Sequence, residues 1–162
     1  MTTDKLLHIY LSDHRAGAHA GRELAKRCLS NNEGSVLGDW LARDLLPAIE
    51  NDRRELESVM DAVGAPKMPW KQAAAWAVEK VGRLKLNGQV RGYSPLSRLL
   101  ELEGLALGVE GKLSLWRSLQ SLSDARLRGH DFDELIASAG GQRAALEERR
   151  VTAAKEAFGN AG

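Results

Sequence analysis

The sequence predicts an all-α protein whose long helices pack as an antiparallel four-helix bundle. Leu and Ala dominate the apolar residues, whereas Phe and Tyr number two each, and this bias favours helix over strand. Apolar residues also recur at three- and four-residue intervals along most of the chain, which is the spacing of one helix face. With 162 residues, 43% of them hydrophobic, residues 1–162 are expected to bury one core as a single domain.

The first half of the chain predicts two long helices. The first is expected at about residues 3–29, capped by Thr3, and its stripe comprises Leu7, Leu11, His14, Ala18, Gly21, Ala25 and Cys28. The second is expected at about residues 35–63, with Ser35 as its N-cap and Gly64 after its end. Pro47 lies inside it and predicts a kink or a break, because proline removes one helical hydrogen bond and clashes with the preceding turn.

The second half predicts one short helix, at about residues 70–86, and two more long helices. Ser94 followed by Pro95 is a start signal for a helix over about residues 94–123. Asp131 and Glu134 form a pair similar to a capping box at the start of the last helix, about residues 131–158. Most connections are short, so neighbouring helices are expected to be antiparallel.

Charge and cysteine content narrow the classes of function. The chain has 23 Lys plus Arg and 22 Asp plus Glu, a formal net charge of +1, which argues against nucleic-acid binding through a broadly basic surface. The single cysteine, Cys28, excludes an intramolecular disulfide and a cysteine-based zinc site, and its place on the stripe predicts a packing role. A charged N-terminal region and the lack of a long apolar run predict a cytoplasmic protein.

Long helices with a longer middle connection resemble the ferritin-like superfamily. The runs YLSDHRAGAHAG, ENDRRELESVM, EKVGRLKLNG and YSPLSRLLELEGLALGVEGK resemble a group of uncharacterised bacterial ferritin-like proteins, which implies the same bundle fold. The dimetal site of ferritin-like enzymes uses Glu-x-x-His pairs, because side chains at i and i+3 share a helix face. No histidine in this sequence follows an acidic residue by three positions, so we expect a branch that lacks this site.

Six polar residues fall on or beside the expected core stripes: His14, Asp52, Glu103, Glu110, Arg143 and Arg150. The two glutamates are seven residues apart, as are the two arginines, so each pair shares a helix face. We expect an internal network in which the arginines neutralise the acids and His14 bonds to Asp52, because buried charges need partners. The alternatives are a divalent cation held by His14, Asp52, Glu103 and Glu110, or side chains that face solvent at the stripe edge.

Glycines cluster in two of the predicted long helices: Gly17 and Gly21 in the first, and Gly104, Gly108 and Gly111 in the third. Glycine inside a helix costs about 1 kcal/mol relative to alanine. We therefore expect close backbone contact at these positions, either between the two helices or with a second subunit.

These observations favour a protein that acts by association, as a homo-oligomer or with another helical protein, without catalysis, a cofactor or nucleic acid. One alternative is a ferritin-like protein that binds a metal ion or small ligand in its interior. Another is a peripheral membrane or stress-related module that uses Trp70, Trp76 and the surrounding basic residues, although we expect these tryptophans to plug the bundle instead.

Overall fold

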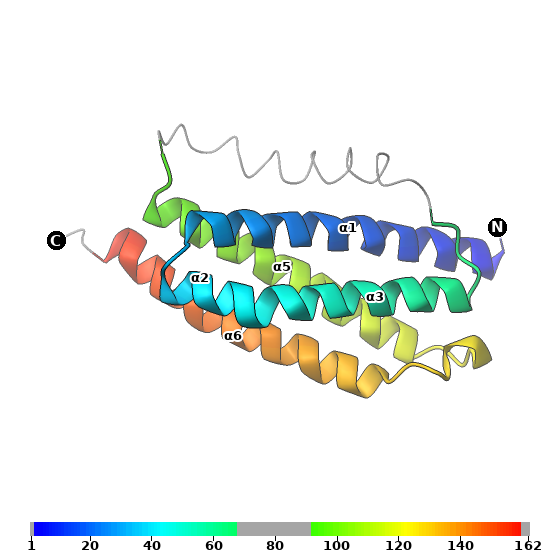
Figure 1. Cartoon of the computed structure of the whole chain (residues 1–162). Coiled ribbons are helices and arrows are strands. Elements are labelled where there is room, and N and C mark those ends of the chain that lie inside the picture. Colours follow the sequence, from blue (N-terminus) through cyan, green and yellow to red (C-terminus); the bar gives the residue numbers. More distant parts are fainter. Residues whose placement is uncertain (1, 68–91, 160–162) are drawn as a thin grey trace.

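The computed structural model describes residues 2–67 and 92–159, and every regular element in these ranges is a helix. Long helices lie side by side in this part of the chain (Figure 1). The elements in chain order are α1 (Thr3–Asn31), α2 (Val36–Trp40), the π-helical turn η1 (Leu41–Leu45), α3 (Leu46–Ala62), α5 (Pro95–Gln120), the 3-10 turn η2 (Ala125–Leu127) and α6 (Phe132–Phe158). The all-α prediction is confirmed for these residues, whereas the helix predicted at residues 70–86 lies outside them.

The helices pack in two neighbouring pairs. α1 is antiparallel to the continuous helical stretch of α2, η1 and α3, and α5 is antiparallel to α6 (Figure 1). α1 also packs against α5. α3 and α5 run in the same direction, because both begin at the end where α1 stops (Figure 1). Lys67 and Gly92, the described residues on either side of the gap, therefore lie at opposite ends of the helices.

Three of the predicted helix starts carry the expected side-chain cap. The side-chain oxygens of Ser35, Ser94 and Asp131 each accept a hydrogen bond from the backbone N–H three residues later, at 3.0–3.1 Å. These bonds satisfy N–H groups that have no partner within the helix. The prediction for Thr3 is wrong: the residue preceding α1 is Thr2, and its side chain makes no capping bond.

Pro47 does not break the second helical stretch. The residues before it, Leu41–Leu45, form a π turn, and α-helix resumes at Leu46. Proline has no N–H, and its ring would press against the carbonyl group four residues earlier, that of Arg43. Because Arg43 lies in the π turn, the wider turn accommodates the ring. The predicted break is therefore wrong, and a local widening within a continuous helical stretch stands in its place.

The described core consists of two apolar clusters, and α1, α3, α5 and α6 contribute to both. Burial of such side chains is the main stabilising force, about 1.5–3 kcal/mol for each large one. The cluster nearer the start of α1 includes Leu11, Leu56, Met60, Trp116 and Leu135. The cluster nearer α2 includes Cys28, Leu41, Leu45, Leu102 and Leu146, which confirms the packing role predicted for the cysteine.

Substitution of Gly38 by alanine should destabilise the protein. A Cβ at Gly38 would lie 2.2 Å from the backbone oxygen of Asn32, and the Ser35 hydroxyl ties these two residues together by bonding to both. We expect Gly38→Ala to lower the free energy of unfolding by about 1–3 kcal/mol, a typical penalty for overpacking, as measured by urea denaturation. In the matched control Gly141→Ala, where a Cβ meets nothing within 4 Å, the same quantity should rise by about 0.5–1 kcal/mol. Equal effects of the two substitutions would contradict this account of the turn.

Candidate functional site

Three polar side chains form a buried layer between the two apolar clusters: Asp52 of α3, Lys112 of α5 and Gln142 of α6. Lys112 Nζ donates hydrogen bonds to Asp52 Oδ2 and to Gln142 Oε1, the latter at 2.6 Å. Gln142 Nε2 donates to Asp52 Oδ2 at 3.1 Å and to the Ser138 hydroxyl at 3.3 Å. Asp52 is 4% and Gln142 9% exposed, and the Lys112 side chain is 16% exposed. This polar layer therefore joins three helices inside the protein.

The Lys112 ammonium and the Asp52 carboxylate stabilise each other's charged forms. Burial lowers the pKa of Lys112 below its ordinary value of 10.5, and the Asp52 carboxylate opposes this shift through its charge and its hydrogen bond. A buried carboxylate without a cation is strongly unfavourable, and removal of one partner from such a pair typically costs about 3–5 kcal/mol. The layer thus has the properties of a satisfied internal network.

His14 does not belong to the polar layer. Two ion pairs show the register at which α1 lies against α3, namely Arg15–Glu57 at 3.3 Å and Arg22–Glu50. In this register Asp52 faces the level of Ala20, which places His14 about six residues, or ~9 Å, away along the helix axis. The predicted bond between His14 and Asp52 is therefore wrong. Because α2 extends beyond the end of α1 (Figure 1), Asp52 packs nearer to that end of α1 than His14 lies.

The surroundings of His14 are aromatic. Its ring meets the ring of Tyr10 edge-on, with 4.6 Å between the ring centroids. Partial burial lowers the pKa of His14, and the charge of Asp13 opposes that shift. The imidazole is therefore biased towards its neutral form at neutral pH.

The structure brings each predicted glutamate to a predicted arginine, but at the protein surface. Glu103 lies 3.6 Å from Arg150, and Glu110 lies 3.7 Å from Arg143. The glutamate side chains are 42% and 54% exposed, respectively. The matched seven-residue spacings pair in this way because α5 and α6 are antiparallel. Exposed ion pairs of this kind contribute only about 0–1 kcal/mol each.

The six predicted polar residues thus do not converge on one interior site. The cation beside Asp52 is the ammonium group of Lys112, which sequence reasoning missed. A signal was present, since Lys112 lies three residues after Val109 and directly before Leu113, both of which are buried. Within residues 2–67 and 92–159, no group of three or more His, Cys, Asp or Glu side chains is arranged to hold a metal ion.

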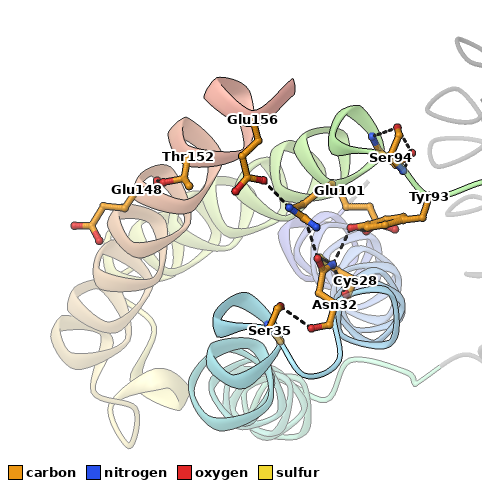
Figure 2. A network of polar contacts seen from close by, with 12 residues as sticks. Cys28, Asn32, Ser35, Tyr93, Ser94, Glu101, Glu148, Thr152 and Glu156 are labelled. Carbon is orange, nitrogen blue, oxygen red and sulfur yellow. Dashed lines mark hydrogen bonds and ion pairs between the residues drawn. The ribbon is translucent and has the colours of Figure 1, made fainter. Parts of the chain in front are cut away.

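A second polar network closes the end of the helices where α1 stops (Figure 2). Asn32 Nδ2 donates to the backbone oxygen of Cys28 and to the hydroxyl oxygen of Tyr93, each at 2.7 Å. The Tyr93 hydroxyl donates to Glu101 Oε2 at 3.0 Å. Glu101 is 7% exposed and also accepts from Arg27 Nε at 2.9 Å. This end network ties the turn after α1 to the residues that lead into α5.

Arg98 extends the end network to α6. Its Nε donates to Asn32 Oδ1 at 2.8 Å, and its Nη1 donates to Glu156 Oε2 at 2.5 Å (Figure 2).

Burial raises the pKa of Cys28 to about 12 and that of Tyr93 to about 12, and the Glu101 charge adds to both shifts. The thiol and the phenol are therefore protonated near neutral pH, and the thiol is a poor nucleophile. The sequence predicts a packing role for Cys28 but not the hydrogen bonds around it, because the partners lie in turns or off the main stripes.

Four of the five predicted helix-packing glycines have open space beside them in the part of the chain that the structure describes. Apart from their own helix backbone and chain neighbours, no atom of residues 2–67 and 92–159 lies within 4 Å of a Cβ built at Gly17, Gly21, Gly108 or Gly111. A hydrogen bond from Tyr10 to Ser118 and one from Arg27 to Glu101 show the register of α1 against α5, in which Gly17 lies level with Gly111. Tight contact between α1 and α5 therefore does not explain these four glycines, while contact with a second subunit stays a prediction. Gly104 lies on α5 and is partly buried.

Comparisons with known proteins do not assign a family: no family model, curated protein or solved structure matches this chain. The membrane alternative rests on Trp70 and Trp76, which lie outside the described residues, so it stays a prediction. None of the described helices combines the length and apolar character needed to cross a membrane.

The stability of the protein should depend on the protonation of Lys112. Because its pKa in the folded protein lies below the unfolded value of 10.5, the unfolded chain binds more protons in the window between the two pKa values. The free energy of unfolding should then increase with pH across this window. We expect the difference in that free energy between wild type and Lys112→Met, measured by urea denaturation from about pH 8 upward, to rise through the window. A difference that falls with pH would show that burial does not dominate the environment of Lys112.

Proposed function

We propose that the protein acts by association with a second copy of itself, through the outer seam between α1 and α5. The observation that supports this is that no other described part of the chain covers Gly17, Gly21, Gly108 and Gly111. Leu107 belongs to the same seam and is 73% exposed. These five residues define the glycine seam.

The energetic argument concerns four glycines within two helices. Each costs about 1 kcal/mol of helix stability relative to alanine, and no close contact within the described chain offsets this loss. A helix of a second copy could approach such a seam closely, because no Cβ atoms hold its backbone away. The burial of Leu107 in that contact would add the stabilisation expected for a large apolar side chain leaving water.

The proposed fold of the monomer is a ferritin-like bundle. Helices α3 and α5 run in the same direction (Figure 1), so the end of α3 and the start of α5 lie at opposite ends of the helices. Ferritin-like bundles join two helices that run in the same direction by one long crossover connection. The short helix predicted at residues 70–86 would belong to such a connection. The charged N-terminal region and the lack of a long apolar run support a cytoplasmic location.

Charged substitutions in the glycine seam should weaken self-association. We expect Leu107→Glu combined with Gly108→Glu to raise the dimer dissociation constant at least ~10-fold, since each charge would be buried against the partner. Light scattering over a concentration series measures this, with circular dichroism to show that helix content is retained. The matched control is Val151→Glu, at an exposed apolar residue of α6 (38% exposed), which should leave association unchanged. A wild-type protein that stays monomeric at high concentration would contradict the proposal.

The alternative function, an interior metal ion or small ligand, would have to use Asp52, whose carboxylate accepts bonds from Lys112 and Gln142. A positive ammonium at this carboxylate repels a divalent cation. We therefore expect elemental analysis of the purified protein to find no divalent metal in stoichiometric amount. A stoichiometric metal that is lost in the Asp52→Ala variant would favour the interior site instead.

A further inference from the structure

We propose that the polar layer of Asp52, Lys112 and Gln142 fixes the register of α3 against the α5–α6 pair and thereby limits the chain to one helix arrangement. In this role the layer favours one helix packing over alternative packings of similar stability, and it does so whether or not two copies associate. The layer holds its three side chains in bonds that cross between helices in every direction: α5 to α3, α5 to α6, and α6 to α3.

The apolar clusters specify the register weakly. Leucines recur along α5 at Leu99, Leu102, Leu105, Leu113 and Leu119, all of them buried. A helix that slides past its neighbour by about two turns would again meet leucine-rich faces, because such ladders repeat. Non-directional apolar burial changes little between these packings.

The surface ion pairs between α5 and α6 also tolerate a slip. Their members are seven residues apart on both helices, so a seven-residue slip exchanges partners and keeps one of the two pairs. It would place Glu103 beside Arg143, or Glu110 beside Arg150. Because exposed pairs contribute little, losing the other pair penalises the slipped packing only slightly.

The polar layer does not tolerate the same slip. A shift of α5 by two turns removes Lys112 from Asp52 and leaves both charges among apolar side chains. Breaking a buried pair in this way is far more unfavourable than losing an exposed one. Single buried polar residues are known to select register and oligomeric state in helical assemblies at a cost in stability, and this layer matches that role.

The test replaces the whole layer with apolar side chains of comparable size, as Asp52→Val/Lys112→Met/Gln142→Leu. We expect the midpoint of urea denaturation to stay at or above that of wild type, because no charge is left buried. We expect the amide NMR spectrum to show several sets of peaks or broadened peaks, and light scattering to show mixed species. The control Glu110→Gln/Arg143→Gln removes a surface pair and should retain one sharp set of amide peaks.

Two further outcomes decide the inference. A triple variant with a single sharp spectrum and the wild-type oligomeric state would overturn it, since one arrangement would then persist without the layer. A triple variant that loses its helical circular dichroism signal would overturn it as well. The layer would then be needed for the stability of the fold rather than for the selection of one helix packing. The single variant Lys112→Met should have a lower midpoint than wild type, and an unchanged midpoint would show that Lys112 and Asp52 do not act as a pair.

Discussion

The arrangement of helices depends on one constraint: the carboxylate of Asp52 is buried and must have a positive partner. Water cannot solvate it, so the partner has to come from another helix, and Lys112 of α5 supplies it. Gln142 then bonds to both charged groups and brings in α6. The two apolar clusters lie on either side of this polar layer. A helix packing that buries both clusters must therefore also keep the hydrogen bonds among Asp52, Lys112 and Gln142.

Buried polar side chains outside the polar layer also have hydrogen-bond partners within the chain. Among the described residues, Trp116 Nε1 is the buried side-chain nitrogen or oxygen atom that has no hydrogen-bond partner. In the end network, the buried Glu101 accepts from Arg27, Asn31 and Tyr93. These groups are occupied by contacts within the chain, which suits a structural role. The proposed function therefore rests on an outer face, the glycine seam, which the described helices leave uncovered at its four glycines.

Much of the fold follows from local sequence. Ser35, Ser94 and Asp131 begin helices because their side chains bond to backbone N–H groups within the next turn, an interaction that needs no tertiary contact. The seven-residue spacings of Glu103 with Glu110 and of Arg143 with Arg150 likewise indicated their pairing. Helix periodicity placed Asp52 and Cys28 on core faces, and the structure buries both.

The sequence by itself determined the helical class, the approximate helix limits and the neutralisation of Glu103 and Glu110 by arginines, because all three depend on spacing along a single helix or on matched spacing on two. Only the tertiary structure decided that Lys112 neutralises Asp52, that His14 lies elsewhere and that Tyr93 meets Asn32. Those contacts depend on how far one helix extends beyond the end of its neighbour and on the register at which the two helices pack. Such offsets are set by the sum of many side-chain contacts, and no local pattern encodes them.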